Sequence, residues 1–326
     1  MRRSDLEERA GAPMLTSAEL AIARTVIYAS LFDYPLTLAQ LHGTLIESAL
    51  SESALLSAYR SSAVLPRIVE HRDGFFFPAG RYDIVVERRR REARSRAFLD
   101  AHGPLLRLIC AMPFTRLVAL SGSVAHLNLE SGDDLDLFIV TRGRRVWSVT
   151  VAIVVLAKLL RRRRTLCANF VIADSRLMLE QQDLFTANQA IHLKPLTGRD
   201  LYREFLAANP FVGRFYPNAA GLAPFTPLFR RASPVDRFKS ALEVLLAWPS
   251  YPVEALCRSA YGWYLRRRSA GWRSPGQVRL ERDALKLHTQ SHRQSILDRF
   301  ERAVEEGLAR ADELEPVRIM RRTATR

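Results

Sequence analysis

The sequence is poor in cysteine and has no apolar run long enough to cross a membrane. Its 326 residues include three cysteines, Cys110, Cys167 and Cys257, which are far apart and follow no zinc-binding spacing. A disulfide framework is therefore not expected, and a reducing compartment suits the chain. The apolar run at 146–160 contains Lys158 and falls short of the roughly 20 residues that a bilayer requires. We expect no integral membrane segment and, because the charged N-terminus lacks an apolar signal core, a cytoplasmic location.

Acidic residues are scarce relative to basic ones. The chain has 34 Asp and Glu against 49 Lys and Arg, which gives a net charge of +15. This balance favours polyanionic partners: nucleotides, nucleic acid or an anionic membrane surface. A GC-rich genome can also produce an arginine-rich composition. The net charge alone therefore does not select nucleic acid from the other candidate partners. The apolar fraction of 48% excludes a disordered chain, and the length allows two or three domains.

The first 80 residues predict a unit like a winged helix, made of three helices and a β-hairpin. The sequences TSAE and TLAQ are helix capping boxes, and the Asp73-Gly74 pair is a hairpin turn signal. Winged helices often place one helix in the DNA major groove. Here the third predicted helix carries a single basic residue, Arg60. Contact with a protein partner therefore stands beside DNA binding as a role for residues 1–80.

The remainder predicts a mixed α/β (α+β) protein. Residues 81–112 form a long basic helix with a potential break at Gly103-Pro104, which links the first unit to an α/β core over 113–176. In that core two strands, a helix and a third strand follow one another. Residues 177–326 are expected to be mainly helical, with the aromatic side chains between 248 and 264 packed between helices.

Two aspartates interrupt the second predicted strand of the core. In DDLDLFIVT, Asp134 and Asp136 are two residues apart, so their side chains point to the same side of a strand. Two neighbouring carboxylates on a buried face repel one another unless a cation lies between them. Mg²⁺ or Mn²⁺ suits them, because these ions combine a few carboxylates with water and phosphate oxygens. A solvated pair at the end of a strand is the simpler alternative.

The preceding predicted strand ends in a second polar signal. Gly122 lets a phosphate approach the backbone closely, and the Ser123 hydroxyl and the amides of the following turn can donate to phosphate oxygens. Nucleophilic catalysis by Ser123 with His126 is not expected, because no nucleophile-elbow pattern surrounds them. The Gly-Ser pair and the two aspartates together predict a site for a nucleoside triphosphate.

These motifs resemble the DNA polymerase β-like nucleotidyltransferase superfamily, and most of all its bacterial minimal and aminoglycoside-type domains. The superfamily motif is a strand that ends in Gly-Ser, a spacer, and then acid-apolar-acid-apolar. It is matched here by GS at 122–123 and DLDL at 134–137. The resemblance covers residues 115–174, under a quarter of the chain.

The resemblance implies a function and a set of site residues. Asp134 and Asp136 would hold the metal ions, and Gly122 and Ser123 the β- and γ-phosphates. The reaction would transfer a nucleoside monophosphate from an NTP, with ATP the first candidate, to a hydroxyl on a small molecule, an RNA or a protein.

One part of the superfamily pattern is missing. A third carboxylate normally comes from the next strand and serves as the general base, but in TLCANFVIAD Asn169 occupies that place. Asp174, at the end of the same strand, is our candidate for the base, with Glu180 and Asp183 as alternatives. Without a base, the chain would be a nucleotide-binding regulatory protein whose N-terminal unit contacts nucleic acid or a partner.

Overall fold

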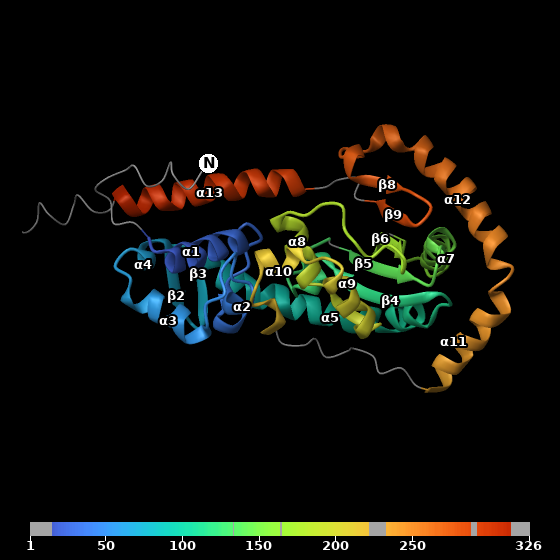
Figure 1. Cartoon of the computed structure of the whole chain (residues 1–326), viewed down its shortest axis with the longest axis horizontal. Coiled ribbons are helices and arrows are strands. Elements are labelled where there is room, and N and C mark those ends of the chain that lie inside the picture. The colour runs from blue at the N-terminus through green and yellow to red at the C-terminus, as the bar shows by residue number, and fades with distance from the viewer. Residues whose placement is uncertain (1–14, 133, 164, 222–232, 288–291, 314–326) are drawn as a thin grey trace, which may run out of the picture. The chain divides into compact units, whose positions relative to one another are not determined.

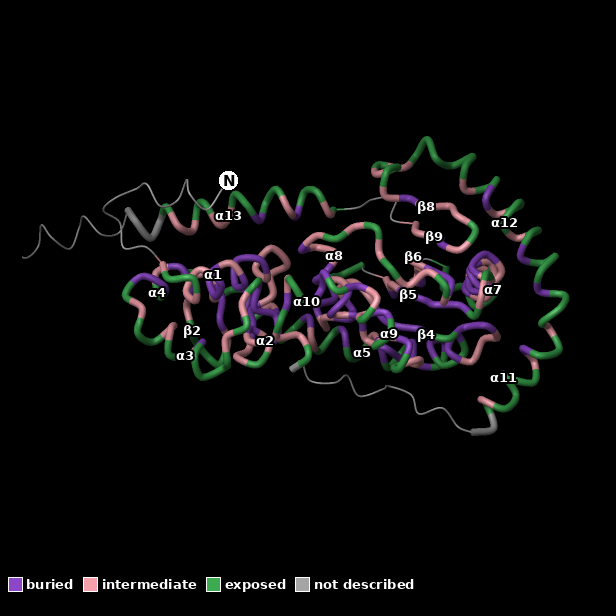
Figure 2. Tube along the Cα trace, viewed as in Figure 1, coloured by how far each residue is buried: buried purple, intermediate pink, exposed green. Residues whose placement is uncertain are grey.

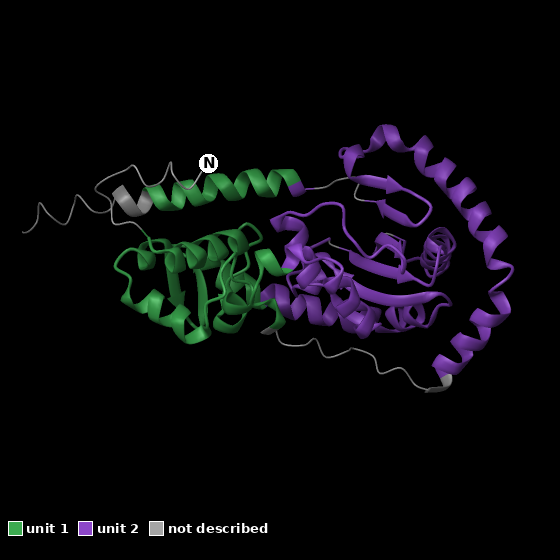
Figure 3. Cartoon of the chain, in the orientation of Figure 1, with its two compact units in different colours: residues 1–89, 213–222, 294–326 green, residues 90–212, 223–293 purple. Residues whose placement is uncertain are grey.

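A computed structural model describes most of the chain (Figure 1). The described residues are 15–132, 134–163, 165–221, 233–287 and 292–313. They form two compact units that alternate along the sequence (Figure 3). Residues 1–89, 213–222 and 294–326 make unit 1, and residues 90–212 and 223–293 make unit 2. The chain is therefore not divided at the predicted boundaries 80, 112 and 176.

Unit 1 contains the predicted short helices and hairpin. Its first elements are α1 (Ser17–Ser30), β1 (Leu36–Thr37), α2 (Leu38–Gly43), α3 (Glu52–Ser61), α4 (Leu65–Ile68), β2 (Val69–Arg72) and β3 (Phe75–Pro78). Both capping boxes are confirmed. The Thr16 and Thr37 hydroxyls accept from the third helical amide, and their backbone N–H groups donate to the Glu19 and Gln40 side chains. The hairpin is also confirmed, with Asp73 and Gly74 at φ values of 53° and 79°. The three strands form an antiparallel sheet in the order β1-β3-β2.

The last described helix, α13 (Arg293–Glu313), also contributes to unit 1. The Phe300 ring packs edge-on against Tyr28 at 5.1 Å between centroids, and Gly307 lies beside Ile27. The hydrophobic core of unit 1 therefore combines residues from opposite ends of the sequence.

Unit 2 is built on a six-stranded mixed sheet in the order β7-β4-β5-β6-β9-β8. The strands are β4 (Thr115–Ser121), β5 (Leu135–Thr141), β6 (Leu166–Ala173), β7 (Lys194–Thr197), β8 (Val278–Leu280) and β9 (Ala284–Leu287). β4 and β5 are antiparallel, whereas β5 and β6 are parallel. The mixed α/β class is therefore confirmed. The mainly helical region expected after residue 176 supplies three of the six strands.

The remaining helices belong wholly or partly to unit 2. They are α5 (Asp83–Ala111), α6 (Gly122–Ala125), α7 (Val146–Leu159), α8 (Leu184–Ile191), α9 (Arg199–Ala207), α10 (Phe211–Phe215), α11 (Ser233–Leu246) and α12 (Ser250–Arg267). α5 runs through Pro104 without a break, because Leu105, Leu106 and Ile109 beyond it are anchored in the core. α7 packs on the sheet, and α12 on α7. Among the helices described, none is long and apolar enough to cross a membrane.

The alternation of residues along β5 separates two faces of the sheet. Leu135, Leu137 and Ile139 point into the hydrophobic core with α7. Asp136 and Phe138 belong to the opposite face, because side chains alternate along a strand. The sequence therefore sets the acidic pair on the face of the sheet that α7 does not cover.

Candidate active site

The Gly-Ser turn and the acidic pair meet where β4 ends and β5 begins. Ser121, the last residue of β4, pairs with Asp136 of β5. Gly122 follows with φ +64°, in the left-handed region that favours glycine. A Cβ added to Gly122 would collide with the Asp136 carboxylate. The backbone conformation therefore favours glycine here, and a larger residue would force the Asp136 carboxylate to move.

A third strand completes the cluster. One ligand atom each from Asp134, Asp136 and Cys167 lie within 4.8 Å of one another, on half-buried side chains. Cys167 of β6 is in register with Asp136, and two residues of β5 then oppose three of β6. Alternation along β6 places Asn169 on the same side as Cys167, and its amide donates a hydrogen bond to Asp136 Oδ1.

The donor atoms of this cluster suit a hard divalent cation. The two carboxylates offer oxygen, which Mg²⁺ and Mn²⁺ prefer. Burial and then the neighbouring Asp134 raise the pKa of the Cys167 thiol to about 12, so the thiol is protonated and donates to Asp134. Asp134 and Asp136 would therefore hold Mg²⁺ or Mn²⁺, and Cys167 would support one of them. We did not predict Cys167 as a site residue from the sequence. Its position two residues before Asn169 places it on the same side of the strand, which could have identified it.

Asp174, our candidate for the general base, does not join the cluster. Its backbone N–H donates to the carbonyl of Thr141, at the far end of β5. Five residues separate Thr141 from Asp136, about 17 Å along a strand. The Asp174 carboxylate instead accepts from the Gly143 amide at 2.9 Å and forms an ion pair with Arg116 at 3.0 Å. The expectation that Asp174 reaches the metal site is therefore corrected, and we assign this residue a structural role.

The two alternative bases are also engaged elsewhere. Glu180 pairs with Arg279 and Arg176, and the hydrogen bond from Arg279 is the main cause that lowers its pKa. Asp183 caps α8 by accepting from the Thr186 amide at 2.8 Å, and it contacts Arg293. Neither carboxylate belongs to the cluster around Asp136, and both are poor proton acceptors.

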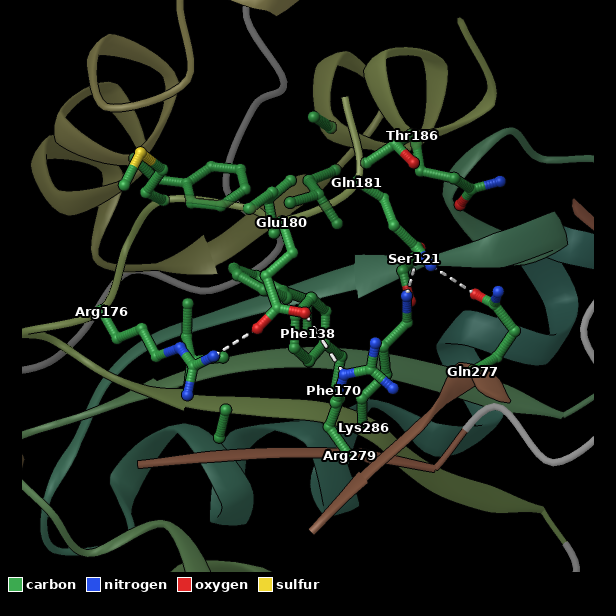
Figure 4. A pocket seen from close by; sticks show the side chains of 18 of the residues that line it. Ser121, Phe138, Phe170, Arg176, Glu180, Gln181, Thr186, Gln277, Arg279 and Lys286 are labelled. Atoms are coloured by element: carbon green, nitrogen blue, oxygen red, sulfur yellow. Dashed lines mark hydrogen bonds and ion pairs between the residues drawn. The ribbon is translucent and has the colours of Figure 1, made fainter. Parts of the chain in front are cut away.

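A pocket continues from the acidic site along the same face of the sheet (Figure 4). Ser121 lines it next to the acidic pair, and Phe138, Phe170 and Phe205 provide an apolar floor. Its polar lining includes Arg176, Glu180, Gln181, Gln277, Arg279 and Lys286. The pocket therefore offers an aromatic floor with amide and cationic groups around it.

Lys286 is the lining residue most available to a ligand. Its amine donates to Gln181 Oε1 at 2.9 Å and lies 5.6 Å from the centre of the Phe170 ring. Arg176, Arg279 and Arg293 each form ion pairs with carboxylates, whereas the ion pairs found among the described residues do not include Lys286. Burial, and then the nearby arginines, lower its pKa to about 8. An anionic group in the pocket would favour the charged amine.

Comparison of the chain with family models, with curated proteins and with solved structures gave no match. The function is therefore argued from the site alone.

A second cationic side chain lies on the opposite side of the Gly-Ser turn. Lys194 of β7 pairs with Leu120, next to Ser121, and burial lowers its pKa. The ring of His126, just after α6, lies 4.2 Å from that of His192, whose pKa burial lowers to about 4. A neutral His192 adds no charge beside Lys194.

The arrangement as a whole can bind a polyphosphate. The acidic pair can hold a divalent ion, and the Gly-Ser turn can donate to phosphate oxygens. The aromatic pocket beside them can hold an organic group attached to the phosphates or a second substrate.

Proposed function

We propose that this chain is a metal-dependent nucleotidyltransferase that transfers a nucleoside monophosphate from an NTP to a hydroxyl acceptor. One observation carries the proposal: the Gly122 backbone lies directly against the Asp136 carboxylate, at the paired ends of β4 and β5. A phosphate on the turn and a metal ion on the acids would therefore be immediate neighbours. The antiparallel β4–β5 pair followed by parallel β6 is in keeping with the sheet that the superfamily resemblance implies.

The chemistry would divide between these residues as follows. Asp134 and Asp136 would hold Mg²⁺, which would neutralise charge on the phosphates. The turn at Gly122 and Ser123 positions the triphosphate for in-line attack. The acceptor oxygen bonds to the α-phosphorus, the bond from that phosphorus to the bridging oxygen breaks, and pyrophosphate leaves. With Asn169 in place of an acid, the acceptor proton passes to solvent.

A second function is favoured by a specific contact. Asn169 donates to Asp136 at the place where the superfamily resemblance calls for a base, and an amide cannot accept a proton. A chain that binds NTP without transferring it would act as a nucleotide-dependent regulator. The element order of unit 1, α1-β1-α2-α3 followed by the β2–β3 hairpin, supports a winged-helix assignment. That unit would carry the contact with nucleic acid or a protein partner.

The deciding experiment measures transfer and binding together. Purified protein is incubated with each α-³²P-labelled NTP, Mg²⁺ or Mn²⁺, and cell extract as a source of acceptors. The Asp134→Ala/Asp136→Ala variant is the control, and nucleotide binding is measured by calorimetry with and without metal. Label that enters a product only with the wild type supports the transferase. Metal-dependent binding without label supports the regulator, and no metal-dependent binding contradicts both.

A further inference from the structure

Helices α11 and α12 bury charged side chains and expose many of their large apolar ones, the reverse of an ordinary surface helix, while Leu246, Cys257, Tyr261 and Leu265 pack partly against the core. The buried side chains on this pair are polar: Lys239, Glu243, Ser250 and Glu254 are all less than a tenth exposed. Large apolar side chains on the same helices, and Trp248 between them, are exposed. Trp248 is 87% exposed, Val244 78% and Leu245 74%. Surface helices normally bury the apolar side, so this reversal calls for an explanation.

Specific hydrogen bonds fix the inner side of α11. The buried Lys239 amine donates to the Cys110 carbonyl at 3.2 Å and to Thr115 Oγ1 at 2.7 Å. Glu243 accepts from the Phe114 backbone N–H at 2.7 Å and forms an ion pair with Arg142. These partners belong to the backbone and side chains of unit 2, so α11 cannot rotate its apolar side inward without leaving buried charges unpaired.

A second set of hydrogen bonds fixes the orientation of α12. The Glu254 carboxylate accepts from the backbone N–H groups of Trp147 at 2.9 Å and Ser148 at 2.7 Å, and from the Ser148 hydroxyl at 2.6 Å. It thereby satisfies the free amides in the first turn of α7. The reversal is thus anchored at both helices, and the outward direction of their apolar side chains follows from it.

Most residues along the arc that α11 and α12 make are exposed or half-buried (Figures 1 and 2). Phe238, Leu256 and Trp263 add exposed apolar side chains along both helices, at 70%, 68% and 56% exposure. Many large apolar side chains exposed on one helix pair mark a surface that binds another molecule. We name this surface, formed by the exposed side chains of residues 237–268, the outer belt.

The exposed charges of the outer belt have one sign. Arg237, Arg258, Arg266 and Arg267 are exposed, whereas Glu243 and Glu254 are turned inward. The guanidinium of Arg267 lies over the Trp263 ring at 4.4 Å from the centroid. A second copy of the chain would bring these arginines opposite one another, because a two-fold interface pairs the same patch with itself. Charge therefore disfavours self-association and favours a partner that offers both apolar and negatively charged groups.

We propose that the outer belt docks this protein on an anionic lipid membrane. Exposed Trp and Tyr with arginine beside apolar side chains is the composition of helices that lie in a membrane interface. None of the described helices is long and apolar enough to span the bilayer, so the contact is peripheral. The inference is independent of the reaction at Asp134 and Asp136.

The test is flotation of the full chain with vesicles. Vesicles of phosphatidylglycerol and phosphatidylcholine in equal amounts are compared with pure phosphatidylcholine. The wild type should float with the anionic vesicles, less so as salt rises, and its tryptophan emission should shift to shorter wavelength. Leu245→Ser/Trp248→Ser should lower the bound fraction about tenfold, because both side chains leave water on binding. Leu108→Ser is the matched control, since Leu108 is an exposed apolar residue of α5.

Further outcomes separate the partners. Arg266→Glu/Arg267→Glu should abolish binding to the anionic vesicles, while circular dichroism shows that the variants remain folded. Failure of the wild type to bind at low salt would overturn the proposal, as would equal binding by the outer-belt variants. A dimer in light scattering that Leu245→Ser/Trp248→Ser converts to monomer would assign the belt to a second copy instead.

Discussion

Acidic residues lie at both ends of the β5–β6 pair, and the two ends differ in how they are neutralised. At one end, Asp174 is held by the Arg116 guanidinium and the Gly143 amide. At the other, Asp134 and Asp136 gather within reach of one cation, and their contacts include a protonated thiol and the Asn169 amide. An acid that is already paired stabilises the fold, whereas neighbouring acids supported by neutral groups leave room for an external cation. The partners of a carboxylate therefore distinguish a structural acid from a site.

The largest effect should come from removing the acidic side chains at each end of the β5–β6 pair in turn. Asp134→Ala/Asp136→Ala should lower metal-dependent transfer by about a hundredfold or more, because both oxygen donors for the metal are lost. Asp174→Ala should leave transfer within about threefold, since its carboxylate is remote from the site. Steady-state assays of both variants check this. A strong loss with Asp174→Ala alone would reverse the comparison.

Gly122→Ala should be the most damaging single change at the turn. The positive φ and the collision of its Cβ with Asp136 together should lower the free energy of unfolding by about 2–3 kcal/mol. Gly80→Ala is the matched control, because Gly80 has φ +82° and open space around it, and it should lose only about 1 kcal/mol. Urea denaturation measures both. Equal losses would show that backbone strain alone sets the requirement for glycine.

Asn169→Asp would add a third carboxylate beside Asp134 and Asp136. Without metal, repulsion from Asp136 should lower the free energy of unfolding by about 1–2 kcal/mol. Mg²⁺ should restore the loss, because it binds the folded state preferentially. Thermal denaturation with and without Mg²⁺ checks this, and the penalty should vanish in an Asp136→Asn background. A gain in transfer by Asn169→Asp would identify the missing base as the limit on activity.

Arg116→Gln should have a smaller effect at the opposite end. The Arg116–Asp174 pair is partly exposed, so its loss should lower the free energy of unfolding by about 1 kcal/mol or less. Chemical denaturation at low and high salt measures it, and the difference from wild type should shrink at high salt. A change in metal affinity would contradict a purely structural role for this pair.

The smallest effect concerns the pocket beside the acidic end. The pKa of Lys286 is lowered to about 8, against an ordinary value near 10.5, so between these values the folded chain binds fewer protons than the unfolded chain. The free energy of unfolding of wild type relative to Lys286→Met should therefore rise as pH increases through that window. Denaturation at several pH values tests the sign, and a constant difference would show that the amine is solvated.

Local signals in the sequence predicted local structure well. The capping boxes and the Asp73-Gly74 turn act over four residues and needed no tertiary information. The acidic pair and the Gly-Ser turn were predicted as one site because residue type and spacing were sufficient to indicate them. The structure brings both together.

The wrong predictions share one cause. Strand register and long-range strand pairing cannot be deduced from a short segment of sequence. Asp174 was proposed as a base because it follows β6, but the parallel register sets it beside Thr141. The register that sets Cys167 and Asn169 beside Asp136 is also a property of the pairing. Strands β7, β8 and β9 have three or four residues each and are held by their neighbours in the sheet. Of the aromatic residues predicted to pack between helices, Tyr261 packs against the core, whereas Trp248, Tyr251, Trp263 and Tyr264 are exposed.

The alternation of the two units along the chain has a consequence for synthesis. Unit 1 begins at the first described helix, yet α13, with Phe300 packed on Tyr28, comes from the last part of the sequence. β8 and β9, which extend the sheet of unit 2, also follow residue 270. On the ribosome, neither unit can complete its core until these later segments have emerged. Fragments cut at a linear boundary should accordingly expose apolar surface and aggregate.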